Sequence, residues 1–111
     1  MQPSLTHQLA DLLLAIEAEM RRIDLWGAAS PSEAALRSTT PFCHDTLAFH
    51  QWLQWVFLPR MKTVLGEDAG WPARSDIFPL AAEALRECEA DPSELLLLIK
   101  QLDNFINRSA G

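Results

Sequence analysis

The stretch from Ser38 to Leu65 constrains the fold most, because its apolar side chains fall on two opposite sides of one predicted helix. Pro41 disfavours a helical residue before it and Asp45 has an N-cap side chain, so the helix is expected to begin near Asp45 or Thr46. At about 100° per residue one side carries Phe49, Trp52, Leu53, Val56 and Phe57, and the other carries Leu47, Trp55 and Leu58. A helix with two apolar sides needs neighbours on both, which places it at the centre of the fold.

A proline lies inside this predicted helix, at position 59. Proline lacks a backbone N–H, and its ring crowds the carbonyl four residues earlier, here that of Trp55. The sequence therefore predicts a central helix that is kinked or broken at Pro59. Without that interruption, Arg60 would lie on the apolar stripe beside Phe49 and Val56. Its charge would then need a polar partner or, as the favoured interpretation, a path to solvent along its stem.

Apolar residues three and four positions apart predict other helices on both sides of the central one. The first runs from Ser4, a plausible N-cap, to about residue 25, and the last spans 92–107. A capping box with proline predicts a short helix over 31–37, and Asp76 is expected to cap another over 78–89. The predicted fold is all-α: residues 1–111 form a single domain, a small bundle of four long helices and one short helix.

Length and charge narrow the functional classes. A chain of 111 residues is large enough for one core but not for two. Hydrophobic content of 49% excludes a disordered chain. A formal charge of −6 argues against sequence-independent binding to nucleic acid, because such binding depends on Lys and Arg side chains at the phosphates. A protein partner or a small basic ligand fits this charge better.

Cysteine usage and the absence of hydrophobic segments predict a cytoplasmic protein. Cys43 and Cys88 lie in unrelated contexts, and Asp11 and Glu17 interrupt the only apolar run near the amino terminus. We therefore expect two reduced thiols, no secretory signal and, since no apolar run reaches about 18 residues, no membrane span.

Candidate chemical groups cluster at Cys43, His44, Asp45 and His50. Structural zinc sites usually show paired short spacings such as CxxC, and none is present here. Adjacent Cys and His side chains also point in divergent directions, unlike a catalytic pair. The sequence favours packing and capping roles, with no catalytic residue, metal or cofactor. A small-ligand-binding protein or enzyme with a pocket near Cys43, His44, Asp45 and Arg60 remains the alternative.

Trp52 and Trp55, with Gln51 and Gln54, have the side chains needed to stack on and hydrogen-bond a nucleobase. Tryptophans at helical spacing are more often core residues, and the acidic balance lacks the basic frame of an RNA-binding surface. The sequence therefore favours burial of both indoles over direct contact with nucleic acid.

Several apolar residues lie off the main stripes of the outer helices. Leu14, Ala18 and Leu25 form a second stripe on the first helix, and Leu97 lies opposite the main stripe of the last. If the fold leaves any of them exposed, a protein partner or a second copy of the chain would cover them. Acidic neighbours such as Asp11 would favour a basic partner.

The stretch Ser38–Met61 also carries a family resemblance. Thr-Pro-Phe at 40–42, Asp-Thr at 45–46, Gln-Trp-Leu-Gln-Trp-Val at 51–56 and Pro-Arg-Met at 59–61 resemble the signature of the YqcC-like family. Its members are small bacterial all-helical proteins without an assigned activity. The resemblance implies an intracellular helical domain, commonly encoded beside the tRNA pseudouridine synthase C gene, and supplies no catalytic residue. It implies a non-enzymatic interaction or accessory module, with a tRNA pseudouridine synthase as candidate partner.

Overall fold

A computed structural model describes residues 5–43, 45–67 and 74–109, and the described residues are helical with no strand. The predicted all-α class is therefore confirmed. The helices are α1 (Leu5–Arg22), α2 (Glu33–Leu36), α3 (Phe49–Trp52), α4 (Leu58–Glu67), α5 (Phe78–Ala84) and α6 (Ser93–Ser109), with a 3-10 turn at Pro41–Cys43 and a π-helical turn, η2, at Leu53–Phe57. Since α3, η2 and α4 follow one another directly, they form one continuous central helix over residues 49–67. Ser4, the predicted first cap, lies outside the described residues.

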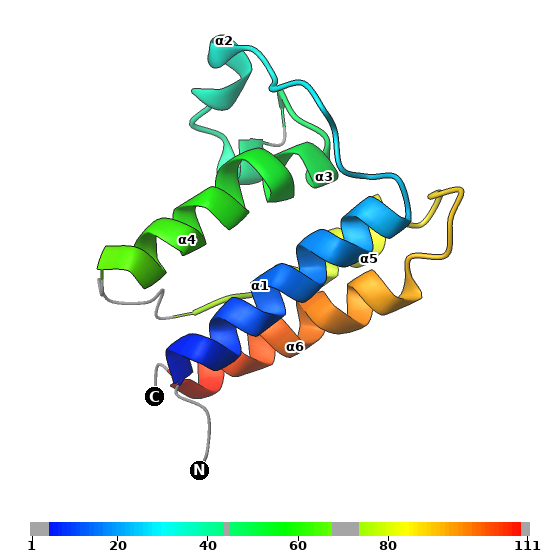
Figure 1. The fold of residues 1–111 in the computed structure, drawn as a ribbon. Helices are drawn as coiled ribbons and strands as arrows, with labels where there is room; N and C mark the ends of the chain where they lie inside the picture. Colours follow the sequence, from blue (N-terminus) through cyan, green and yellow to red (C-terminus); the bar gives the residue numbers. More distant parts are fainter. Residues whose placement is uncertain (1–4, 44, 68–73, 110–111) are drawn as a thin grey trace.

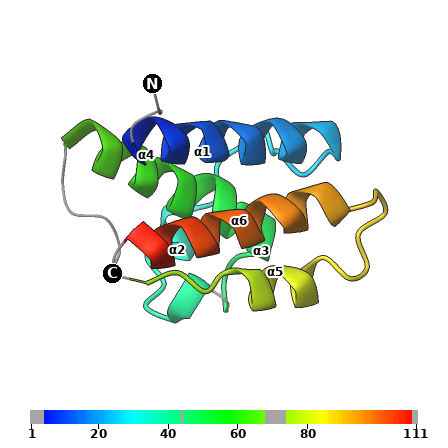
Figure 2. The same cartoon turned by 90° about the horizontal axis from the view of Figure 1, so that it is seen from below.

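The helices pack around this central helix and the pair formed by α1 and α6 (Figure 1). α1 and α6 run antiparallel and side by side, and α4 lies along the other side of α1. α5 packs on α6 and α3, as the view from below shows (Figure 2). α2 and the 3-10 turn lie over the α3 end of the central helix.

The core is built from the stripes that the apolar spacing predicts. On α1 the buried residues include Leu9, Leu13, Ile16 and Met20, and on α6 they are joined by Leu95, Ile99, Leu102 and Ile106. The central helix supplies Trp52, Leu53, Phe57 and Leu58, so apolar groups from both of its predicted sides are buried. Its place at the centre of the fold is confirmed.

The irregularity of the central helix lies one turn before Pro59 and takes a different form from the one predicted. The backbone N–H of Leu58 donates to the carbonyl of Leu53, five residues earlier, which defines the π-helical turn. The helix then continues as α4 through Pro59 without a break. A wider turn at this point accommodates the missing N–H and the bulk of the proline ring. The helix therefore passes through Pro59 without the predicted break.

The central helix begins at Phe49 and not near Asp45 or Thr46 as predicted. Asp45 instead accepts a hydrogen bond from the hydroxyl of Ser38 at 2.5 Å. Thr46 donates from its hydroxyl to a backbone carbonyl of α2 at 2.7 Å. Both side chains therefore tie the connecting segment to itself and to α2. Ala48 occupies the N-cap position of the central helix.

The helix α5 ends at Ala84, so it is shorter than the long helix predicted over 78–89. Its first turn is capped from another helix and not by the predicted Asp76. The backbone N–H of Phe78 donates to Asp103 Oδ2 of α6 at 2.8 Å, and Ser75 Oγ donates to Asp103 Oδ1 at 2.5 Å. Asn107 pairs with both backbone groups of Ser75 at 2.8 Å each. The start of α5 is thus fixed by tertiary contacts.

Candidate functional site

Two of the leucines that lie off the main stripes are exposed. The Leu14 side chain is 61% exposed on α1, and Leu97 is 49% exposed on α6. On α1, Leu14 shares its face with Ala18 and Arg21, which are also exposed, whereas Leu97 shares a face of α6 with Gln101 and Asn104. The two leucines lie on different helices, α1 and α6, which pack against each other. Leu25 is half-buried and lines a cavity described below.

The candidate pocket around Cys43 has a different arrangement from the one its residue types suggested. Cys43 is buried, with 6% of its surface exposed, and Asp45 is exposed and bonded to Ser38. Arg60 lies on an exposed side of α4, and His44 is outside the described residues. Cys43, Asp45 and Arg60 are absent from the walls of five surface cavities formed by the described residues.

The largest of these cavities is a groove between the end of α1 and the central helix, with a volume of about 500 Å³. We call it the tryptophan groove; its walls include Arg21, Trp26, Gln54, Trp55, Pro59 and Lys62. The π-helical turn contributes Gln54 and Trp55 to it. π-Helical turns inside α-helices are frequent at functional sites, so their presence in a groove wall supports a functional role.

Gln54 fixes the wall of the tryptophan groove that follows α1. Its side chain is buried, with 5% of the residue exposed. Gly27 donates its N–H to Gln54 Oε1 at 2.8 Å, and Gln54 Nε2 donates to the Gly27 carbonyl at 2.8 Å. This pair of bonds satisfies the buried amide on both sides and holds the segment after α1 against the π-helical turn.

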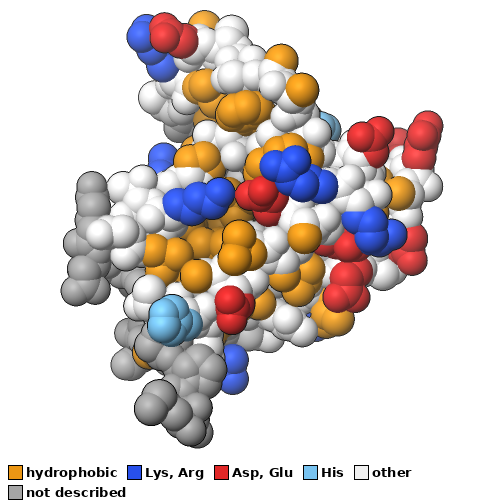
Figure 3. Space-filling view, in the orientation of Figure 1, with side chains coloured by type: hydrophobic (Ala, Val, Ile, Leu, Met, Phe, Trp, Pro, Cys, Tyr) orange, Lys and Arg blue, Asp and Glu red, His pale blue; other side chains and the backbone are white. Residues whose placement is uncertain are grey.

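Positive charge gathers at the mouth of the tryptophan groove. The Arg21 guanidinium lies 4.8 Å from the centre of the Trp26 ring, a cation–π contact. Arg21 Nη2 is 3.2 Å from Glu17 Oε2, and Lys62 Nζ is 3.4 Å from Glu17 Oε1. Two cations therefore share one carboxylate. In the space-filling view, blue and red side chains alternate over the middle of the front face (Figure 3).

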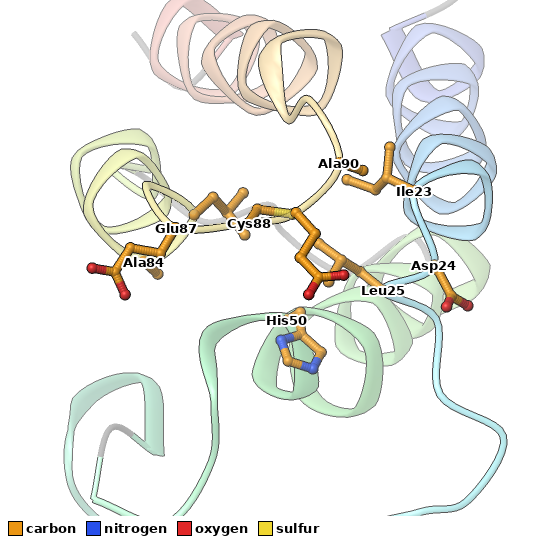
Figure 4. A pocket seen from close by; sticks show the side chains of 10 residues that line it. Ile23, Asp24, Leu25, His50, Ala84, Glu87, Cys88 and Ala90 are labelled. Atoms are coloured by element: carbon orange, nitrogen blue, oxygen red, sulfur yellow. The ribbon is translucent and has the colours of Figure 1, made fainter.

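A second cavity, of about 380 Å³, lies on the other side of the segment that follows α1. Figure 4 shows Ile23 and Asp24 on one side, Ala84 and Glu87 on the other, and His50 of α3 below them. Leu25 and Cys88 also line it, together with Glu89. Its floor is apolar and its charged neighbours are carboxylates, in keeping with the acidic side chains gathered at this end of the molecule (Figure 3).

His50 in this cavity makes the stability of the domain depend on pH. Burial lowers the pKa of His50 below its ordinary value of 6.5. As the pH falls through 6.5, the unfolded chain takes up the proton before the folded chain does. The free energy of unfolding therefore decreases as the pH falls below 6.5 and has its full value above that pH. We expect the melting temperature to fall between about pH 7.5 and pH 5.5, and to fall less in His50→Gln. An unchanged pH slope in His50→Gln, measured by circular dichroism, would contradict this.

The described side chains do not assemble a metal centre: no group of three or more His, Cys, Asp or Glu among them could hold an ion. In the same part of the chain, no helix is both long and apolar enough to cross a membrane. The groove brings together indole surfaces, two cations and a buried amide, and carboxylates surround the other cavity.

The two cavities were not evident from the sequence. The helical spacing predicts Trp55 as a core residue, yet Trp55 lines one groove together with Arg21. The only local signal was the placement of Gln54 among apolar residues at the centre of a two-sided apolar helix. A buried amide at such a position requires partners, and here they lie 27 residues away in sequence.

Fold and site define a small all-α domain whose concave features suit binding. Comparison with known proteins identifies its family. The family model DUF446, described as tRNA pseudouridine synthase C, matches residues 8–105. The chain belongs to this family and is YqcC-like.

Relatives of similar length support this assignment. A Haemophilus influenzae protein named uncharacterized protein is 31% identical over 103 residues, covering 93% of this chain and 96% of the relative. YqcC of Escherichia coli, also named uncharacterized, is 32% identical over 99 residues, which cover 88% of this chain and 91% of YqcC. The solution NMR structure of E. coli YqcC has a TM-score of 0.85 at 28% identity, and the match covers 98% of this chain and 93% of YqcC.

A third relative is a much longer protein. Sixty-six residues are 41% identical to part of the tRNA pseudouridine synthase C of Pectobacterium carotovorum. The match covers 60% of this chain but only 18% of that protein. A segment similar to part of this domain therefore lies within a chain that carries the name of the synthase.

Proposed function

We propose that this domain is a non-catalytic accessory module that binds a tRNA pseudouridine synthase of the C type and assists tRNA modification. The observation that carries the proposal is the similar segment within the P. carotovorum synthase. Two domains on one polypeptide are held at high effective concentration, so a contact between them needs little affinity of its own. A chain that carries only the small domain would have to bind the enzyme as a separate partner.

The exposed leucines supply a candidate contact surface for the synthase. Leu14 is 61% exposed on α1 and Leu97 is 49% exposed on α6, whereas interface cores are rich in large apolar side chains. The chain has a formal charge of −6, and an enzyme that binds tRNA needs a basic surface. Charge complementarity with such a surface would raise the association rate and favour this partner over acidic proteins.

The alternative of an enzyme or ligand pocket around Cys43 has less support. Cys43 is buried, and Asp45 is bonded to Ser38. Neither lines any of the cavities described above, and neither does Arg60. We therefore favour binding without chemistry of its own.

Affinity capture of the tagged chain from its native cells, with nuclease present, tests the proposal. We expect the synthase to be captured, and Leu14→Asp or Leu97→Asp to reduce the capture at least tenfold, because each buries a charge in an apolar contact. Both substitutions should leave stability within about 0.5 kcal/mol of wild type, as exposed positions usually do.

Ala34→Asp is the matched control, because Ala34 is exposed on α2, away from both leucines, and the substitution adds the same charge. It should capture the synthase as well as wild type does. Full capture by both well-folded leucine variants would place the contact elsewhere, and failure of the wild-type chain to capture the synthase would refute the proposed function.

A further inference from the structure

We propose that the tryptophan groove is a binding site for a nucleotide unit, a planar base beside a phosphate. Neither exposed leucine lines this groove, and the inference does not depend on the proposed function. The source of the unit is either a free nucleotide or a residue of single-stranded RNA, and the experiment below distinguishes the two.

The size and lining of the groove fit a nucleotide. Its volume of about 500 Å³ lies within the usual range for small-molecule sites, about 300 to 1,000 Å³. Trp26 and Trp55, both half-buried, present indole surface there, and the guanidinium of Arg21 lies over the Trp26 ring. Indole and guanidinium planes are the two protein surfaces on which splayed bases stack.

The charge of the groove favours an anion although the chain as a whole is acidic. Arg21 and Lys62 share the single carboxylate of Glu17, which leaves one positive charge in excess among these three groups. The Debye length is about 8 Å at physiological salt, so the charges at the mouth act most strongly on a ligand bound in the groove. The side chains of Lys62 and Arg21 are 56% and 57% exposed, so both cations are accessible to a phosphate at the mouth.

The groove is preformed, which reduces the cost of binding. The two hydrogen bonds between Gln54 and Gly27 fix the segment that carries Trp26, and the continuous central helix carries Trp55 and Lys62. A site whose walls are already fixed loses less conformational entropy when it takes up a ligand. Fixed walls with exposed cationic side chains at the mouth are suited to a base held by stacking and a phosphate held by charge.

Titration of the full chain with uridine 5′-monophosphate, a uridine octamer and inorganic phosphate, followed by NMR of the indole N–H groups, tests the proposal. We expect shifts at Trp26 and Trp55 with the nucleotide or the octamer, and little effect of phosphate alone. Trp55→Ala should weaken binding about fivefold or more, the usual loss when one stacking surface is removed. Lys62→Gln should also weaken it and should reduce its dependence on salt.

Arg86→Gln is the control for Lys62→Gln, because Arg86 is also an exposed cation in an ion pair, with Glu83, and does not line the tryptophan groove. It should bind as wild type does. Saturation by the monophosphate supports a free nucleotide, whereas saturation by the octamer alone supports single-stranded RNA. The proposal is overturned if neither probe shifts the two indoles, if phosphate alone binds as tightly, or if the folded variants bind like wild type.

Discussion

Replacing Leu53 by alanine is expected to lower the free energy of unfolding by about 2 to 5 kcal/mol. Leu53 is completely buried and accepts, through its carbonyl, the hydrogen bond that closes the π-helical turn. Truncation leaves a cavity at the point where the central helix contacts its neighbours. Since a domain of this size has only about 5 to 15 kcal/mol of stability, this loss is a large fraction of the total.

Urea unfolding followed by circular dichroism measures the effect. Leu97→Ala is the matched control, because it removes the same atoms from a side chain that is 49% exposed, and it should change stability by no more than about 0.5 kcal/mol. Equal unfolding midpoints for Leu53→Ala and wild type would contradict the placement of Leu53 and the central helix in the hydrophobic core.

Replacing Asp103 by alanine is the second large expected loss, about 2 to 4 kcal/mol. Asp103 is 6% exposed and accepts hydrogen bonds from the Phe78 N–H and the Ser75 hydroxyl. Alanine would leave both donors without their carboxylate partner and would release the start of α5. Asp103→Asn keeps one acceptor oxygen, so its loss should be smaller.

Thermal unfolding of Asp103→Ala beside Asp76→Ala separates a tertiary cap from a local one. Asp76 is the cap that the sequence predicted, but it is exposed, and the structure gives the capping contact to Asp103. We expect a large loss for Asp103→Ala and a small one for Asp76→Ala. A larger loss of stability for Asp76→Ala than for Asp103→Ala would indicate that Asp76 caps α5 and would contradict the observed hydrogen bonds.

The long helices of this fold were predictable because their signal is local. On α1 and α6 a buried apolar residue recurs every three or four positions, and the approximate helix bounds follow from that spacing. The two-sided apolar pattern of residues 49–58 likewise predicted a central position. In each case a single physical cause, burial of apolar surface, decides the outcome.

The features missed from the sequence are a local irregularity and contacts between residues distant in the chain. The π-helical turn before Pro59 relieves a proline clash that local rules resolve as a kink. The short α5 begins where Asp103, 25 residues away, accepts its first N–H. The tryptophan groove exists because Gln54 bonds to Gly27 across 27 residues. None of these contacts leaves a periodic pattern in the sequence.

Isothermal titration of the purified chain into a purified tRNA pseudouridine synthase C from the same cells tests the central functional claim most directly. We expect the chain to bind the synthase saturably and one to one. Leu14→Asp or Leu97→Asp should reduce the affinity at least tenfold, and Ala34→Asp should leave it unchanged. Absence of binding heat at several temperatures, with no complex detected by sedimentation of the same mixture, would contradict the claim that this domain is an accessory module of the synthase.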